Sequence, residues 1–131
     1  MTRFDYPPEC RLRSPADYER VYAGKQRFSD TRLLVYAAAN SLGTLRAGFS
    51  VSRKHGGSVV RHRLKRLLRE AYRLVRAELP AGLDLVVIPQ SGATSTMQEY
   101  QWSLERLARK AARRLLPADR VPAPETEEGS P

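Results

Sequence analysis

The chain has 131 residues, and its 23 lysines and arginines outnumber its 14 aspartates and glutamates, which gives a net charge of +9. Hydrophobic residues make up 41%, enough for a packed interior, so a wholly disordered basic polypeptide is excluded. No apolar run is long enough to span a membrane, the N-terminus lacks the apolar core of a secretory signal, and the single Cys10 excludes an internal disulfide. We therefore expect a small cytoplasmic protein whose partner is a polyanion.

The two ends of the chain differ in composition from its centre. Pro7 and Pro8 indicate an irregular N-terminal arm over residues 1–10. Residues 117–131 contain four of the nine prolines and one arginine against four acidic residues, so we interpret them as a disordered acidic tail. The folded domain is then expected over residues 11–116.

The first predicted element is a helix that begins at Ser14 and Pro15 and ends at Gly24. Ser14 can cap the free amides, Pro15 suits the first helical position, and glycine is common just after a helix. Residues 32–39 and 45–52 have the composition and alternation of strands, and the turn-forming residues 40–43 between them predict a hairpin.

The second half of the chain continues with a loop over residues 53–57, a helix over 58–78, a buried strand over 83–88, a loop over 91–95 and a helix over 97–116. The predicted order is α-β-β-α-β-α, a single-domain α+β sandwich with a mostly antiparallel sheet. If every helix packs on one face of that sheet, the other face stays open.

The helix over residues 58–78 has two chemically distinct faces. On a helical wheel its apolar residues fill an arc of about 120°, and its cations fill a separate arc of about 140° that also contains Tyr72. The apolar arc holds Val60, Leu64, Leu67, Leu68, Ala71, Leu74 and Val75. The cationic arc holds Arg61, Lys65, Arg66, Arg69, Arg73 and Arg76.

Six cations without acidic partners favour a nucleic acid as the ligand of this face. An ordinary solvated helix interleaves charges of both signs. A membrane-bound helix would need its apolar face free, whereas here that face must cover the sheet. Arginine also binds phosphate through a planar fork of donors, which fits the predominance of arginine over lysine.

The residues around this helix extend the candidate binding site, but they do not form a catalytic site. Tyr18, Tyr22, Phe28 and Tyr36 can stack on unpaired bases or pack in the core, and for each ring taken alone the sequence favours the core. The two histidines, His55 and His62, both lie in the basic segment, and no paired carboxylates, Ser-His-Asp set or metal-ligand cluster is present. We therefore expect a binding module and not a self-contained nuclease.

The segment from Phe49 to Glu70 resembles the signature of the bacterial ribonuclease P protein component. The Arg-Asn-Arg motif of that family, with its following Lys-Arg and Arg, corresponds here to Arg61-His62-Arg63, Lys65-Arg66 and Arg69. His62 stands where that family usually has asparagine. The resemblance covers nearly all of residues 11–116 and extends to the N-terminal helix with its aromatic positions Tyr18 and Tyr22.

The resemblance implies a fold with a left-handed βαβ crossover and a subunit of ribonuclease P, in which a catalytic RNA removes the 5′ leader of precursor tRNA. It implies Mg²⁺ held mainly by the RNA, and as partners the ribonuclease P RNA and precursor tRNA, with no membrane and no obligatory protein partner. The implied RNA-binding residues are Arg53, Lys54, Arg61, His62, Arg63, Lys65, Arg66, Arg69 and Arg73. The implied leader cleft contains Tyr18, Tyr22, Tyr36, Arg46, Ser50 and Ser52.

Composition and the basic helix fit a second hypothesis equally well, namely a structural RNA-binding or RNA-chaperone protein of the ribosomal type without a role in cleavage. The linked signature and the N-terminal aromatic residues favour the ribonuclease P subunit. A helix-turn-helix DNA reader fits less well, because the basic helix lies between strands and lacks a closely following partner helix. The hypothesis of a stand-alone enzyme fits the sequence least well, because no set of catalytic residues is present.

Overall fold

The structure, a computed structural model, describes residues 8–90 and 95–117. The expected acidic tail, the first seven residues and most of the expected loop at 91–95 lie outside the described residues. Within the predicted irregular arm, Pro8–Cys10 forms a short 3-10 helix, and Cys10 is buried. Over these three residues the arm is therefore regular, and the buried Cys10 holds it to the domain.

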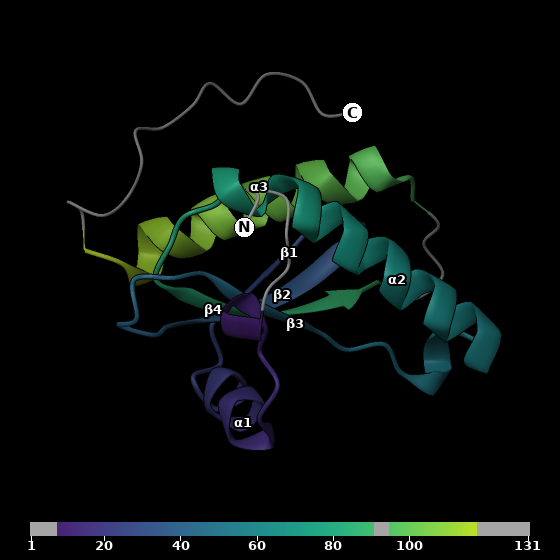
Figure 1. Cartoon of the computed structure of the whole chain (residues 1–131), viewed down its shortest axis with the longest axis horizontal. Helices are drawn as coiled ribbons and strands as arrows, with labels where there is room; N and C mark the ends of the chain where they lie inside the picture. Colours follow the sequence, from purple (N-terminus) through teal and green to yellow (C-terminus); the bar gives the residue numbers. More distant parts are fainter. Residues whose placement is uncertain (1–7, 91–94, 118–131) are drawn as a thin grey trace.

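Three helices enclose a four-stranded sheet (Figure 1). Helices α2 and α3 cover one face of the sheet, and α1 lies on the opposite face. The helices are α1 (Pro15–Ala23), α2 (Ser58–Val75) and α3 (Met97–Leu115), and the strands are β1 (Arg27–Ser29), β2 (Leu33–Ala39), β3 (Arg46–Phe49) and β4 (Leu83–Pro89). The α+β class and the mainly antiparallel sheet are confirmed.

The strand order is β1-β2-β4-β3, so the predicted hairpin of β2 with β3 is wrong. Strand β4 lies between them and pairs antiparallel with β2 and parallel with β3. Helix α2 connects β3 to β4, which confirms the expected βαβ crossover. Five residues of β4, the apolar Leu83, Leu85, Val86 and Val87 and the charged Asp84, are at most 1% exposed, as expected for a central strand covered on both faces.

The turn after β2 explains why no hairpin forms. The Asn40 backbone N–H donates to the Gly82 carbonyl at 2.9 Å, and the Gly82 N–H donates to the Thr44 carbonyl at 3.0 Å. The Asn40 side chain also donates to the carboxylate of Asp84 at 2.8 Å. Residues 40–44 therefore wrap around the start of β4 and leave space for that strand between β2 and β3.

A short edge strand, β1, was not predicted from the sequence. It pairs antiparallel with β2, from Arg27 opposite Tyr36 to Ser29 opposite Leu34. Asp30 closes the tight connection, because its Oδ1 accepts from the backbone N–H groups of Arg32 and Leu33, each at 2.8 Å. Three residues are too few to produce a readable alternation, so only the turn chemistry of Asp30 marks this hairpin.

Side-chain caps fix the starts of two helices. The Ser14 hydroxyl accepts from the N–H groups of Ala16 and Asp17, as predicted for α1. Thr96 and Glu99 form a reciprocal capping box at α3, with distances of 3.1 and 2.8 Å. These caps place both helix starts within a residue of the predicted positions.

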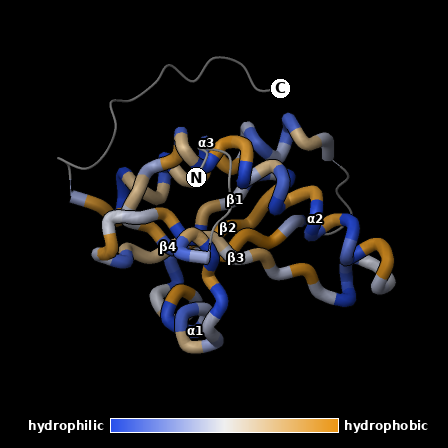
Figure 2. Tube along the Cα trace, in the orientation of Figure 1, coloured by the Kyte–Doolittle hydropathy of each residue, from blue (hydrophilic) through white to orange (hydrophobic). Residues whose placement is uncertain are grey.

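The core has two parts, one on each face of the sheet. The larger part lies between the sheet and α2 and α3, and the smaller part joins Leu12 and Val21 to Val86 under α1. Figure 2 shows hydrophobic residues along the strands and alternating with hydrophilic ones along α2 and α3. The sheet face away from α2 and α3 is thus partly covered by α1, so it is not open along its whole width.

None of the described helices is long and apolar enough to cross a membrane.

Candidate nucleic-acid interface

Helix α2 buries a face that is rotated relative to the sequence prediction. Leu68, Ala71, Tyr72 and Val75 are its buried residues, whereas Val60, predicted to be apolar core, is 48% exposed. Tyr72 was predicted within the cationic arc, but its ring packs edge-on against Phe49 of β3 with centroids 5.8 Å apart. The correction follows from α2 packing against both the sheet and α3, which draws Tyr72 into the core.

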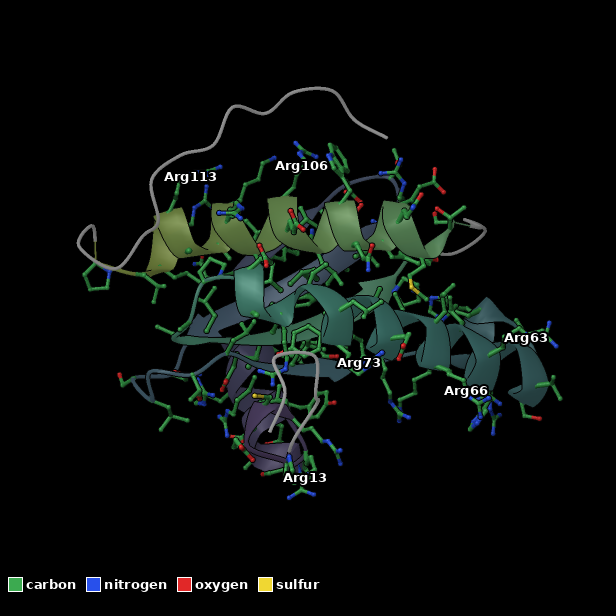
Figure 3. The ribbon with its side chains drawn as sticks, turned by 45° about the horizontal axis from the view of Figure 1, so that its top comes forward. Arg13, Arg63, Arg66, Arg73, Arg106 and Arg113 are labelled. Atoms are coloured by element: carbon green, nitrogen blue, oxygen red, sulfur yellow. The ribbon has the colours of Figure 1, made fainter. Side chains whose placement is uncertain are left out.

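The first turns of α2 extend beyond the sheet and carry an exposed cationic surface. Arg63 and Arg66 project from this end of the helix in Figure 3. Together with Ser58, Val59 and His62 they line a hollow of about 460 Å³. The Arg66 guanidinium lies 3.4 Å from Nε2 of His62. Four predicted RNA-binding residues near this end, Arg53, His62, Arg63 and Arg66, are exposed.

The far end of the predicted cationic arc is engaged within the protein. Arg73 forms an ion pair with Glu70, and its Nε donates to Oε2 at 3.0 Å. This hydrogen bond lowers the pKa of the Glu70 carboxyl. Arg76 donates to Sγ of the buried Cys10 at 3.3 Å. The prediction of six unpaired cations is therefore wrong, because Glu70 reaches Arg73 across one helical turn.

The segment before α2 is a short 3-10 helix, Arg53–His55, and not an irregular loop. Nδ1 of His55 accepts from the Ser52 N–H at 3.0 Å, and its Nε2 lies 2.7 Å from the carbonyl oxygen of Pro89 at the end of β4. His55 was predicted as part of the basic segment, but its ring ties that segment to the sheet. Arg53 and Lys54 are exposed on this fixed turn.

The N–H of the Arg61 side chain donates to the Gly56 carbonyl at 3.2 Å. Arg61 therefore joins the first turn of α2 to the turn that carries Arg53 and Lys54.

A groove of about 410 Å³ lies between the N-terminal segment, α1, β3 and α2. We call this cavity the groove, and it is lined by Arg11, Leu12, Arg13, Tyr18, Gly48, Phe49, Lys65 and Arg69. Its cations come from segments more than fifty positions apart in the chain. Folding therefore brings the positive charges of these side chains together around the ring of Tyr18.

Tyr18 is placed in the groove by a glycine. A Cβ on Gly48 would lie 2.1 Å from the Tyr18 hydroxyl oxygen and 3.0 Å from the Leu12 carbonyl oxygen, so only glycine lets the ring lie over β3. Burial raises the pKa of the Tyr18 phenol, and Tyr22 adds to this, whereas the backbone at Phe49 and the charge of Arg69 act in the opposite direction. The phenol therefore stays neutral at neutral pH.

Of the other residues predicted for the leader cleft, Tyr22 and Tyr36 lie on the same side of the sheet as α1. Tyr22 and Tyr36 pack edge to face, with centroids 4.9 Å apart, and both are half-buried against the smaller core cluster. Ser50 is half-buried beside β4 and Ser52 is exposed. Phe28 lies in the larger core on the other face, so the reading as core is confirmed for that ring.

Arg46 was predicted in the cleft, but its guanidinium is engaged with a buried carboxylate. Its Nε and Nη2 donate to the two oxygens of Asp84 at 2.8 and 2.6 Å, and Arg20 of α1 also pairs with Asp84. Asp84 is fully buried. This arrangement gives both Arg46 and Asp84 a structural role.

Sequence reasoning did not assign Arg11 and Arg13 to the site. The Leu12 N–H donates to the Ala47 carbonyl at 3.0 Å, and the buried Leu12 side chain anchors the segment beside β3. Its two arginine neighbours are exposed and line the groove. The alternation of charged, apolar and charged residues was the available signal, but a three-residue pattern does not say where it docks.

Within residues 8–90 and 95–117, no group of three or more histidine, cysteine, aspartate or glutamate side chains is arranged to hold a metal ion. The guanidinium and ammonium groups that line the groove have the chemistry to bind a polyanion, and the ring of Tyr18 offers a surface for a base.

A small α+β domain with a cationic helix and a cationic groove belongs to the class of compact nucleic-acid-binding modules. The family follows from a protein-family model described as Ribonuclease P, which matches residues 6–112. The chain therefore belongs to the ribonuclease P protein family. A relative from Desulfovibrio desulfuricans, the "Ribonuclease P protein component", is 38% identical over 102 residues, covering 76% of this chain and 78% of the relative.

Solved structures agree with this assignment. The RNase P protein of Staphylococcus aureus matches with a TM-score of 0.66 and 31% identity, over 78% of this chain and 94% of that one. The RNase P protein of Thermotoga maritima matches with a TM-score of 0.63 and 26% identity, over 82% and 98%. The chain thus has the role of a ribonuclease P subunit in the 5′ processing of tRNA.

Proposed function

We propose that this chain serves ribonuclease P by binding two RNA surfaces at once, the catalytic RNA subunit and the 5′ leader of precursor tRNA. The exposed end of α2 and the turn before it bind the RNA subunit. This proposal is supported by the exposure of Arg53, Lys54, His62, Arg63 and Arg66. Arg63 and Arg66 project from the end of α2 in Figure 3. Phosphate contacts of this kind position a protein without demanding a base sequence.

The groove receives the single-stranded leader. The observation that carries this proposal is the convergence of Arg11, Arg13, Lys65 and Arg69 on Tyr18. A cationic groove with an aromatic platform binds single-stranded nucleic acid with little preference for sequence. Such tolerance suits a leader, whose sequence differs from one precursor to another. Tyr22 and Tyr36 lie on the same side of the sheet as Tyr18 and extend the leader site, to which the predicted Ser50 and Ser52 are also assigned.

The chemistry is assigned to the RNA and its Mg²⁺. The described part of this chain does not fit a protein-held Mg²⁺, since no group of three or more carboxylate, histidine or cysteine side chains is arranged there to hold a metal ion. The chain itself contributes charge, because cations placed between two RNA molecules reduce their repulsion. The role of the protein is then to lower the Mg²⁺ concentration at which the two RNAs associate.

The test is cleavage of precursor tRNA at low Mg²⁺ by a bacterial ribonuclease P RNA, with and without this chain. We expect correct 5′ processing only when the chain is present, and no cleavage by the chain alone. Because the reconstitution contains no other protein, success also means that no obligatory protein partner is needed. Tight RNA binding without any rescue of cleavage would contradict the proposal and favour a structural or chaperone role.

A further inference from the structure

A second hollow adjoins the groove, and the proposed function does not use it. It has a volume of about 520 Å³ and lies between the N-terminal segment, the start of α1 and the turn after β2. We call it the turn hollow, and its lining includes Glu9, Arg11, Arg13, Asp17, Leu42 and Arg46. Arg11 and Arg13 also line the groove. The two hollows therefore share one wall, and a strand that lies in the groove can continue across this wall into the turn hollow.

Leu42 is an exposed apolar residue at the edge of the turn hollow. Its side chain is 56% exposed, and the other exposed large hydrophobic residues of the described chain, Val59 and Val60, both lie at the start of α2. Its neighbours Ser41 and Gly43 have positive φ angles of 58° and 73°. The chain therefore turns tightly at Leu42, with left-handed backbone on both sides of it.

The side chain of Asn40 fixes this turn. Its Oδ1 accepts from the Leu42 N–H at 2.9 Å, and its Nδ2 donates to the Thr44 carbonyl at 3.0 Å. The same Nδ2 donates to the buried carboxylate of Asp84 at 2.8 Å. Left-handed backbone at a residue such as Ser41 is strained, and it persists only where the surrounding contacts hold it. The turn is thus anchored to the sheet, and it presents the Leu42 side chain to the solvent.

The charges around the turn hollow separate a place for phosphate from a place for a base. The exposed Arg11 and Arg13 lie on the wall that the turn hollow shares with the groove. The lining away from this wall contains the carboxylates of Glu9 and Asp17, and that of Asp17 lies 3.5 Å from the guanidinium of Arg46. Carboxylates repel a phosphate, but they accept hydrogen bonds from the N–H groups of a base. The shared wall therefore suits the backbone of a nucleotide strand, and the turn hollow suits a base.

This chemistry favours the single-stranded leader as the occupant of the turn hollow. The centre of a protein interface needs several apolar or aromatic anchors, whereas the turn hollow has one exposed large hydrophobic side chain, that of Leu42. The bases of an RNA duplex are paired, so only an unpaired strand can place a base in a hollow. In Figure 3, Arg13 lies beside α1, far from Arg63 and Arg66 at the end of α2 that is assigned to the RNA subunit.

We propose that the turn hollow is a second base-binding subsite for the 5′ leader of precursor tRNA. The leader crosses Arg11 and Arg13 from the groove and places a further base against Leu42. This inference rests on the proposed binding of the leader in the groove. It adds a dependence on length, because a short leader ends within the groove and only a longer one reaches Leu42. Precursors with longer leaders are therefore bound more tightly.

The test measures how the affinity for precursor tRNA depends on leader length. The full chain is reconstituted with a bacterial ribonuclease P RNA, and the Kd is measured for cleavage-resistant precursors whose leaders increase one nucleotide at a time. Leu42→Ser removes the apolar side chain, whereas Leu42→Met keeps an apolar side chain of similar size and is the matched control. Unfolding temperatures are measured first, and neither substitution should lower them, because the Leu42 side chain is exposed.

We expect Leu42→Ser to bind precursors with the shortest leaders as the parent chain does, and to bind those with long leaders about fourfold more weakly for each methylene group that a base buries. Leu42→Met should match the parent chain at every length. A loss in Leu42→Ser that is absent at every length, or is the same at every length, overturns the subsite. Equal losses in Leu42→Ser and Leu42→Met also overturn it, because the contact is then not an apolar one.

A third variant, Arg69→Gln, separates this inference from the proposed function. Arg69 lines the groove and is not part of the lining of the turn hollow, so its replacement should weaken the binding of short and long leaders alike. A loss in Arg69→Gln without a length-dependent loss in Leu42→Ser overturns the turn hollow alone. No loss in either variant overturns both the turn hollow and the groove, and a loss in Leu42→Ser alone overturns the path through the groove.

Discussion

At the scale of single residues, His55 shows how one side chain can position others. Its ring connects the Ser52 N–H to the Pro89 carbonyl, and thereby fixes the turn that carries Arg53 and Lys54. We predict that His55→Ala releases this turn, costs about 1 kcal/mol of stability for the lost hydrogen bonds, and weakens binding to the RNA subunit several-fold.

Amide hydrogen exchange checks the His55 prediction directly. Residues 52–55 should exchange faster in His55→Ala than in the parent chain, while the N–H groups in the centre of α2 should not change. His55→Gln retains a donor for the Pro89 carbonyl and should recover part of the protection. Exchange at residues 52–55 that is the same in all three proteins would show that the ring does not hold the turn.

Gly48 is the second residue whose role depends on one close approach. An alanine there would place its Cβ 2.1 Å from the Tyr18 hydroxyl oxygen, so Gly48→Ala must displace the ring from the groove. We predict a loss of about 1 to 3 kcal/mol from overpacking, together with weaker binding of leader-bearing tRNA and unchanged binding of mature tRNA. Thermal unfolding and filter binding measure the two effects.

Gly57 provides the matched control, because a Cβ there meets no atom within 4 Å. Gly57→Ala should change the unfolding temperature far less than Gly48→Ala. The double variant Gly48→Ala/Tyr18→Ala should lose less stability than the sum of the single variants, since the clash with the ring is gone. Strict additivity would mean that Tyr18 does not lie over Gly48.

At the scale of elements, α2 divides its cations between different tasks. Lys65 and Arg69 line the groove, whereas Arg73 is paired with Glu70. We predict that Lys65→Gln and Arg69→Gln each weaken the binding of leader-bearing tRNA more than that of mature tRNA. Arg73→Gln should have a smaller effect, because its charge is already offset by a neighbour. Equal losses for all three variants would contradict this division.

The elements also show which parts of the fold the sequence could predict. Local signals placed α1, β4 and α3 to within about a residue, because they act within one turn of chain. They also placed the start of α2, but that helix ends at Val75 and a short 3-10 helix, Arg76–Glu78, replaces its predicted last turn. The hairpin of β2 with β3 was wrong because strand order depends on a contact with Gly82, which follows a whole helix later. Pairing between distant strands leaves no signal in local composition.

The residues of the candidate site could also be predicted from the sequence only in part. The wheel identified the cationic helix, but it could not show that packing against two elements draws Tyr72 inward. The helical wheel also could not show that Arg11 and Arg13 line the groove, since their position depends on the backbone of Leu12 docking beside Ala47. Residues whose roles follow from local periodicity were found, and those whose roles follow from tertiary docking were not.

At the scale of the whole molecule, one buried carboxylate ties four segments together. Asp84 of β4 accepts from Arg46 of β3 and from Asn40 in the turn after β2, and it pairs with Arg20 of α1. This network fixes α1 relative to the sheet, and α1 carries Tyr18 into the groove. Stability and the shape of the leader site are therefore coupled through a residue that touches no RNA in the proposed function.

The Asp84 network predicts a measurable dependence of stability on pH. Burial acts to raise the pKa of the Asp84 carboxyl, but hydrogen bonds from Arg46 and Asn40 and the charges of Arg46 and Arg20 outweigh it and lower the pKa below its ordinary value of 3.8. Because the folded pKa is the lower one, the stabilisation is complete above about pH 5 and is lost as the pH falls through 3.8 towards the folded value.

Chemical denaturation of the parent chain, Asp84→Asn and Arg46→Met tests this prediction. Arg46→Met leaves a buried carboxylate with one fewer cation and should cost about 2 to 4 kcal/mol at neutral pH. Asp84→Asn should remove part of the acid dependence, because Glu70 and Glu99, whose pKa values are also lowered, still contribute. The double variant Asp84→Asn/Arg46→Met should be more stable than the sum of the two single losses predicts. The reason is that it removes both the carboxylate and the guanidinium, so neither charge remains without the other. If the parent and Asp84→Asn lose stability identically between pH 5 and pH 2, the network does not supply this stabilisation, and α1 must be held to the sheet by the apolar contacts of Leu12 and Val21 instead.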